Sequence, residues 1–308
     1  RLPISPKIIL ILLVVVIVLG GIVYMRGRNS KSASNKTGGS QAVSANYINF
    51  GGNYVFKVPK DHVVDEQSVP NAQLVYTGNI EAKTLEDVYR NNGIAVQEIS
   101  TLTDHTSNAF KKYVNETYVP DLKKNLSPSD VQTNFGKANG ADNAKVIAKK
   151  DGKIIRYVYI KGGQHPAQVV ANAETDAVKE IIQTIVDVES SIFKNEVTSL
   201  KQTVEKIAYQ VKDKKTQELY SSAAPELREK STQEELSQAL DTATPYRSGS
   251  ITISGGSSAA SDEFASVIRF VKLDKKDQQP AVGSLVLKKI DGQWKLTLLS
   301  LPSPSNNQ

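Results

Sequence analysis

IILILLVVVIVLGGIVYM, running from Ile8 to Met25, is the stretch that decides how this chain is organised. It is 18 residues long and contains no charged side chain. A helix over it would measure about 27 Å, and Pro6, Lys7 and Arg26 extend it to the roughly 30 Å of a hydrocarbon core. A buried core helix or strand is the alternative. The stretch predicts a transmembrane helix in contact with the lipid bilayer, with residues 1–26 as the anchor.

The residues after this apolar run indicate that the anchor is retained. Signal peptides have a small-residue cleavage site directly after their apolar region. Here Met25 is followed by Arg26-Gly27-Arg28, and the nearest tolerable site, Val43-Ser44-Ala45, lies far beyond. The chain has no Cys, so it cannot carry a lipoprotein anchor. We therefore expect an uncleaved signal anchor.

The charges beside the anchor and the tether that follows it predict opposite sides of the membrane for the C-terminal part. Two basic residues precede the apolar run and four follow it by Lys36, which by the positive-inside rule places the C-terminal bulk in the cytoplasm. Residues 27–45 are mostly Ser, Gly, Asn and Lys, which predicts a flexible linker with a reach of roughly 25 Å. This tether, together with the family resemblances below, leads us to expect C-terminal domains on the extracytoplasmic side of the plasma membrane.

The net charge of +6 belongs to the membrane flanks. Residues 1–36 carry six basic and no acidic side chains, and the remainder carries 32 of each sign. A charge-balanced remainder has no overall electrostatic attraction to nucleic acid, so no nucleic-acid partner is expected. The absence of Cys excludes disulfides and thiolate metal sites.

A first folded domain is predicted over residues 46–194. Apolar residues alternate on both sides of Gly51-Gly52, which indicates two short strands and a turn. Lys150-Asp151-Gly152 is a strong hairpin signal between two further strands, and Pro120 interrupts the apolar pattern of a helix. The predicted strands are 73–77, 93–100, 145–149, 153–161 and 168–172, and the predicted helices are 107–126 and 176–193.

The order of these elements resembles the PsbP-like family. The resemblance rests on Tyr54-Val55-Phe56-Lys57-Val58-Pro59 and on the closing segment Ala173–Phe193. The family has a Trp shortly after the Pro, where this chain has His62. The resemblance implies an antiparallel sheet with a C-terminal helix packed on it, and a non-catalytic role in binding or assembly.

A second domain is predicted over residues 195–301, followed by a disordered tail, 302–308. Ser231-Thr-Gln-Glu234 has the spacing of a capping box that opens a helix. Asp291-Gly292 predicts a tight turn between the last two strands. The predicted helices are 197–211, 216–223, a turn from Pro225 and a helix after 231, and the predicted strands are 250–254, 263–273, 281–290 and 293–299.

This second order, helices followed by a meander of strands, resembles the nuclear-transport-factor-2-like superfamily. The residues that carry the resemblance are Leu219-Tyr220, Pro225-Glu226-Leu227, Ser231–Leu236 and Asp291-Gly292-Gln293-Trp294-Lys295-Leu296. It implies a bent sheet wrapped on helices around an apolar cone, a module that bacterial lipoproteins and membrane-anchored proteins often carry. The predicted fold class is therefore α+β, with a transmembrane helix and two domains, each an antiparallel sheet packed on helices.

No motif in the sequence assigns a chemistry. His62, His105 and His165 stand in separate predicted loops, whereas a metal site needs converging donors. No G-x-S-x-G motif occurs, and GKANG at 136–140 lacks the Lys-Ser/Thr of a phosphate loop. We therefore expect no catalytic residue, metal or cofactor, and no enzyme activity.

Some cone-fold enzymes place polar side chains inside the cone. The candidate cone-pocket residues here are Tyr209, Tyr220, Asp241, Tyr246 and Trp294. The alternative is that the tyrosines lie at a rim with wet hydroxyls and that the Asp lies on a solvated helix face.

The sequence as a whole predicts a single-span, non-catalytic binding or scaffold protein of a bacterial cell envelope. Its expected partners are the bilayer and a protein or other envelope component. Two alternatives remain open. One is a scaffold component of a type IV secretion or conjugation channel, and the other is a small-ligand carrier or enzyme that uses the cone pocket.

Overall fold

The computed structural model describes residues 45–66, 68–69, 71–77, 84–247, 249–260, 262–271 and 281–302. The predicted anchor lies outside these residues, as do the linker apart from Ala45 and the tail apart from Pro302. Within the described ranges, no helix has both the length and the apolar character needed to cross a membrane. All described residues fall in one compact unit, Val43–Gln308.

The first sheet, which we call sheet I, is antiparallel and has seven strands in the order β3-β4-β5-β9-β8-β7-β6. Its β7–β8 turn is formed by Asp151 and Gly152, both at positive φ, as the hairpin signal predicted. The strands are β3 Val63–Asp65, β4 Ala72–Tyr76, β5 Ile94–Glu98, β6 Asp130–Ala138, β7 Ala141–Lys150, β8 Lys153–Lys161 and β9 Ala167–Ala171.

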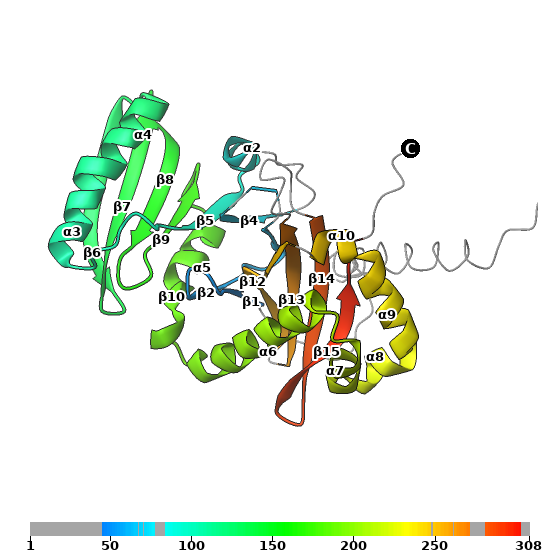
Figure 1. Cartoon of the computed structure of the whole chain (residues 1–308). Helices are drawn as coiled ribbons and strands as arrows, with labels where there is room; N and C mark the ends of the chain where they lie inside the picture. The colour runs from blue at the N-terminus through cyan, green and yellow to red at the C-terminus, as the bar shows by residue number, and fades with distance from the viewer. Residues whose placement is uncertain are drawn as a thin grey trace, which may run out of the picture. The chain divides into compact units, whose positions relative to one another are not determined.

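One long helical segment covers a face of sheet I (Figure 1). It consists of α3 Ser107–Lys112, a π-helical turn at Tyr113–Tyr118 and α4 Val119–Leu126. Pro120 lacks an N–H and cannot continue the regular hydrogen-bond ladder, so the wider turn directly precedes it. The helix and its interruption at Pro120 confirm the sequence prediction. A short helix, α2 Leu85–Arg90, also packs on this core.

The helix predicted over 176–193 is much shorter than expected. Helix α5 covers Asp176–Thr184, and Ile185 is already extended with ψ 114°. Val186 then pairs with Val55 in a two-residue strand, β10 Val186–Asp187, followed by a 3-10 turn at Val188–Ser190. The residues after Thr184, which were expected to continue the helix, instead pair with β2 in a sheet. β-Branched residues such as Val186 are favoured in strands, and the edge of β2 was free to accept them.

The second sheet, sheet II, has eight strands in the order β10-β2-β1-β12-β13-β14-β15, with β11 paired to β13. Asp291 and Gly292, both at positive φ, form the predicted turn between its last two strands. The remaining strands are β1 Asn46–Asn49, β2 Tyr54–Lys57, β11 Ser250–Thr252, β12 Gly255–Ala260, β13 Glu263–Val271, β14 Ala281–Ile290 and β15 Gln293–Ser300.

The β1–β2 hairpin links the two halves of the chain. It comes from the predicted first domain, yet β1 pairs with β12, so that Tyr47 lies opposite Ser257 and Asn49 opposite Gly255. On its other side the hairpin packs on sheet I, where Tyr47, Tyr54 and Phe56 share a core with residues of sheet I. The two regions separated at residue 194 are therefore joined through one shared hairpin.

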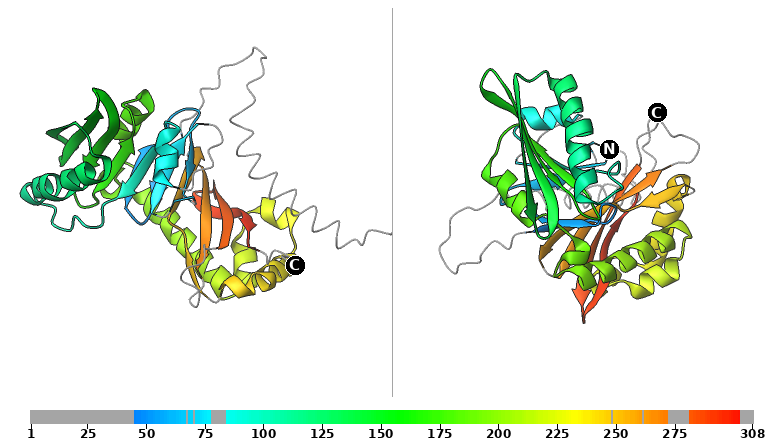
Figure 2. Two further views of the ribbon diagram at one scale, coloured as in Figure 1. Left: turned by 90° about the horizontal axis from the view of Figure 1, so that it is seen from above. Right: turned by 90° about the vertical axis from the view of Figure 1, so that its left-hand side faces the viewer.

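Helices cover one face of sheet II (Figure 2). The last long helix begins one residue later than predicted, because Thr232 is its N-cap and Glu235 completes the capping box. The Ser231–Glu234 assignment was therefore wrong by one position. The helices are α6 Lys194–Lys212, α7 Thr216–Ser222, α8 Pro225–Lys230, α9 Gln233–Thr242 and α10 Thr244–Arg247.

Candidate functional site

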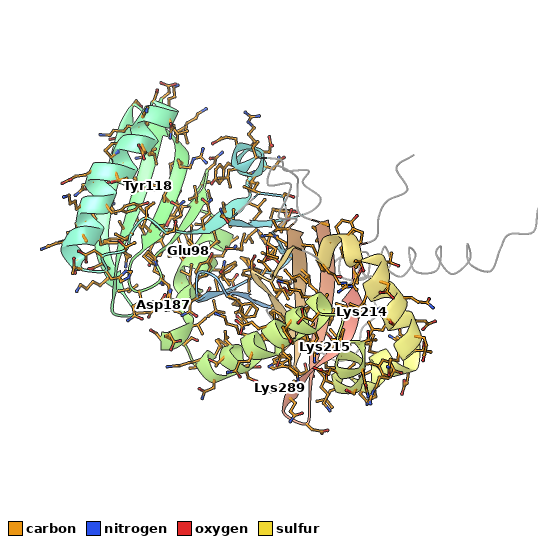
Figure 3. The ribbon with its side chains drawn as sticks, in the orientation of Figure 1. Glu98, Tyr118, Asp187, Lys214, Lys215 and Lys289 are labelled. Atoms are coloured by element: carbon orange, nitrogen blue, oxygen red, sulfur yellow. The ribbon has the colours of Figure 1, made fainter. Side chains whose placement is uncertain are left out.

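Two of the five predicted cone-pocket residues face solvent. Tyr209 lies on α6 and is 55% exposed. Asp241 lies on α9, where its carboxylate is 2.5 Å from the Lys214 ammonium in an exposed ion pair (Lys214 is labelled in Figure 3). Neither side chain can contribute to a pocket inside the second core in this arrangement.

The other three residues contact the core between the helices and sheet II. Tyr220 and Tyr246 are half-buried against it, and the Tyr220 hydroxyl donates to the Arg228 carbonyl at 3.3 Å. Trp294 is buried in the core itself, and its indole N–H has no hydrogen-bond partner among the described residues. The five candidates thus do not converge on one point.

Aliphatic and aromatic side chains fill the interior that the cone resemblance suggested as a pocket. They include Leu200, Leu219, Leu240, Phe264, Ile268, Phe270, Leu285, Leu287 and Leu296, all at most 2% exposed. One polar residue there was not among the predicted candidates. Gln210 on α6 is 1% exposed, and neither end of its amide has a partner among the described residues. Gln210 follows the buried Ile207 by three residues, and this helical spacing was the sequence signal that it would share the buried face of α6.

A small apolar groove lies beside α6 at the edge of this core. Val204 and Ala208 of the helix, Phe50 of the β1–β2 turn, and Ile251 and Ile253 line it, and its volume is about 90 Å³. That is roughly the space of three water molecules. Small-molecule sites have volumes of about 300–1,000 Å³. The groove therefore has the size for a single aliphatic side chain.

The rim of this groove carries both signs of charge. Lys201 and Glu205 of α6 line it and stand four residues apart, so they share one helix face. Tyr209, the exposed candidate described above, follows Glu205 by another four residues. An apolar centre with a charged rim and an exposed aromatic residue is the composition found at protein–protein contacts.

A buried polar junction fixes the shared hairpin to sheet I. The Tyr47 hydroxyl donates to the Glu66 carboxylate at 2.7 Å, and Glu66, which follows β3, is only 6% exposed. Burial raises the pKa of Glu66, while the hydrogen bond from Tyr47 and the nearby Arg269 of β13 oppose that shift. A carboxyl group that follows a strand of sheet I is therefore held by two groups of sheet II.

A second set of side-chain hydrogen bonds also joins the hairpin to sheet I. The Tyr54 hydroxyl of β2 donates to the Gln73 side chain of β4 and accepts from the Asn49 amide at 3.1 Å. Asn49 in turn accepts from the backbone N–H of Gly52 at 2.6 Å, which fixes the hairpin turn. Burial raises the pKa of Tyr54 far above its usual value, so the hydroxyl stays protonated and can act as a donor.

An ion pair connects sheet I to β10, the strand that pairs with β2 of the hairpin. Lys161 of β8 is 7% exposed and contacts Asp187 of β10, which is 14% exposed and is labelled in Figure 3. The Lys161 ammonium also donates to the carbonyl of His165 at 2.8 Å. Burial lowers the pKa of Lys161, and Asp187 offsets this effect. The His165 ring lies 2.9 Å from the Asn53 amide, so residues of both sheets meet here as well.

The three histidines lie apart. The His62 ring contacts its neighbouring backbone at the Lys60 carbonyl, His105 is exposed in a loop, and His165 belongs to the ion-pair region just described. No group of three or more His, Asp or Glu side chains suited to a metal ion occurs in the part of the chain that the structure describes.

No family model matches the chain, and no curated protein matches it either. The chain is similar to the solution structure of cyanobacterial PsbP (CyanoP) from Synechocystis sp. PCC 6803, at 11% sequence identity and a TM-score of 0.34. The similarity covers 50% of this chain and 98% of that structure. PsbP is the family that Tyr54–Pro59 resembles, but a TM-score of this size says nothing about what the chain binds.

Proposed function

We propose that the chain is a non-catalytic binding or scaffold protein of a bacterial cell envelope. Ile8–Met25 would hold it in the plasma membrane, with a PsbP-like and a nuclear-transport-factor-2-like region on the extracytoplasmic side. The main support is the shared β1–β2 hairpin, which belongs to sheet II and packs on sheet I. A unit joined in this way offers surfaces at fixed positions, which is what a scaffold needs.

The α6 groove supports binding of a protein rather than a small molecule. Its volume of about 90 Å³ suits one apolar side chain, and Lys201 and Glu205 can orient an approaching segment. We infer that the groove receives an aliphatic side chain of an envelope protein. Side chains that fill well-packed, desolvated pockets contribute a large share of the binding energy at such contacts.

Membrane extraction and topology test the proposal directly. The full chain is expressed in bacterial cells and should stay in the membrane fraction after washes with high salt and with alkaline carbonate. Protease added to spheroplasts should then degrade the part after residue 45 while a cytoplasmic control protein survives. Recovery of a shortened chain in the medium, or full protection of the C-terminal part, would contradict the proposal.

Site-specific photo-cross-linking tests the groove. A photoreactive amino acid at Ala208 should yield an adduct that disappears when Ile253→Asp is added, because Ile253 lines the groove and is only partly buried, and a charged group in its place would exclude an apolar side chain. The matched control places the same photoreactive group at Lys212, near the exposed end of α6. Equal adducts at both positions, or an adduct that survives Ile253→Asp, would exclude this groove as the contact.

A small-ligand carrier is the second candidate, and one observation favours it. The Gln210 amide and the Trp294 indole N–H are buried without a partner among the described residues. Buried polar groups usually have partners, and a polar ligand could supply them. Native mass spectrometry of the purified full chain would show a constant extra mass if a ligand is retained, and the bare mass would count against this candidate.

A further inference from the structure

Strand β6 is a long and regular open edge of sheet I. All nine of its residues pair with β7, from Asp130 opposite Lys149 to Ala138 opposite Ala141, without a bulge. It is the last strand in the order of its sheet, so the other side of its backbone has no strand partner in the described part of the chain (Figure 2). Most of its side chains are exposed, including Phe135 at 40%.

The other sheet edges are protected in ways that β6 is not. Natural proteins shorten, bulge or charge their edge strands to prevent pairing between molecules. The edge strands β3 and β10 have only three and two residues. The pairing of β15 shifts at Val286/Leu287, and Pro302 follows the strand. Among the described edge strands, β6 alone is long and pairs regularly with its neighbour over its whole length. It is therefore suited to accept another strand.

We propose that β6 pairs antiparallel with β6 of a second copy of this chain, about a two-fold axis at Thr133. The strand carries Asp130 near one end and Lys137 near the other. Antiparallel pairing therefore places Asp130 and Lys137 at the same end of the strand pair, on opposite faces of the sheet, whereas parallel in-register pairing would set like charges directly opposite each other. Lys137 is 72% exposed and its ion pair with Asp142 is long, at 3.9 Å, so this contact leaves the ammonium room to turn toward the second copy.

The register about Thr133 also matches the side chains. It places Val131 opposite Phe135 of the second copy and Gln132 opposite Asn134, on opposite faces of the sheet. Aromatic residues opposite β-branched residues are favourable cross-strand pairs, and facing amides can donate and accept hydrogen bonds with each other. The exposed Phe135 ring gains an apolar neighbour, and no like charges face each other. A two-fold axis makes each of these contacts twice.

Disulfide trapping tests the register, because the natural chain contains no Cys. The full chain with Thr133→Cys is purified in detergent and oxidised. Residues directly opposite on antiparallel strands have Cβ atoms about 4.5–5.5 Å apart, close enough for slight adjustment to allow a disulfide. We expect a reducible dimer several-fold more abundant than with Ser199→Cys, an exposed position on α6. Equal, low cross-linking at the two positions would overturn the proposal.

Sedimentation of the natural chain and two variants supplies an independent measurement. The natural chain should sediment as a dimer, and Phe135→Lys should sediment as a monomer with its unfolding transition retained. Ile192→Lys replaces another exposed apolar residue, 94% exposed and outside β6, and should remain dimeric. A monomeric natural chain, as expected if β6 binds only an extended segment of another protein, would overturn the proposal. So would a dimer that Phe135→Lys leaves intact, because it would associate through another surface such as the apolar N-terminal stretch.

Discussion

The hydroxyl of Tyr47 in sheet II donates a 2.7 Å hydrogen bond to the carboxylate of Glu66, which follows the first strand of sheet I. Both side chains are buried. This contact ties the shared hairpin to the other sheet through an ionisable group. The protonation state of Glu66 therefore affects the free energy of unfolding of the whole unit.

The stability contribution of Glu66 should fall as the pH rises. Burial raises its pKa above the ordinary value of 4.5, so the folded chain keeps this proton at pH values where the unfolded chain has lost it. Its contribution is full below about pH 4.5 and is lost as the pH rises through the folded-state pKa. The loss is about 1.4 kcal/mol for each pH unit that separates the folded and unfolded pKa values. Urea unfolding from about pH 4 to about pH 8 should show this decline in the natural chain and not in Glu66→Gln.

The control for Glu66→Gln is Glu234→Gln on the exposed first turn of α9. Its stability should follow the pH dependence of the natural chain. Parallel curves for Glu66→Gln and the natural chain would show that this carboxyl does not titrate as its burial implies.

Breaking the Lys161–Asp187 pair should destabilise the chain strongly. Lys161→Met leaves Asp187, which is 14% exposed, without its cation, and removing one partner of a buried pair costs about 3–5 kcal/mol. Adding Asp187→Leu should recover much of the loss. Chemical denaturation measures both variants. Lys112→Met, which breaks the exposed Lys112–Glu116 pair, should cost less than about 1 kcal/mol. Similar costs for the two lysines would contradict the structural role of the buried pair.

Replacing Gln210 with Met should stabilise the chain. The amide is buried without a partner among the described residues, and burying such a group costs about 1–3 kcal/mol. Met has a similar size and no hydrogen-bonding group to leave unmet, so we expect a gain of about 1 kcal/mol in the free energy of unfolding. The exposed Gln202→Met is the control and should change stability by no more than about 0.5 kcal/mol. A loss at Gln210 would mean that the amide is hydrogen-bonded, for example by a ligand.

Gly255→Ala should loosen the joint between the hairpin and sheet II. A Cβ at Gly255 would meet the backbone carbonyl of Ile48 and lie 2.8 Å from the Tyr47 hydroxyl. Overpacking of this kind costs about 1–3 kcal/mol. Hydrogen exchange should show faster exchange of the β1–β2 amides. Gly51→Ala, whose nearest contact would be at 3.5 Å, is the matched control, and equal exchange in both variants would contradict this prediction.

The sequence predicted the elements whose local pattern and turn chemistry agree. The hairpins at Asp151-Gly152 and Asp291-Gly292 formed as expected, because both turns need positive φ and both pairs of flanking strands alternate. The helix with Pro120 was also predicted, because an interior proline has a defined local effect. The mixed α+β class with antiparallel sheets follows from these elements.

Elements that depend on distant partners could not be predicted. The strand at 130–138 carries only Val131 and Phe135 as large apolar residues, so its alternation is weak and it is defined by its pairing with β7. Gly255-Gly256 suggests a loop locally, yet these residues form a strand because β1 and β13 lie close on either side. The cone-pocket candidates do not converge for a related reason. The type of a residue does not determine whether its side chain lies on the buried or the exposed face of a helix, and Tyr209 and Asp241 lie on exposed faces.

The shared hairpin also bears on how the chain acquires its structure. Asn46 and Ser258 are partners in one sheet, although they stand near opposite ends of the described chain. Contacts between such distant positions slow folding, because the long loop between them must close first. A ribosome or translocon delivers the chain from its N-terminus, so the edge of β1 that pairs with β12 must stay unpaired until Ser258 has emerged, even if β1 has already paired with β2. Maturation of this protein should therefore be post-translational and should depend on a chaperone that shields that unpaired edge.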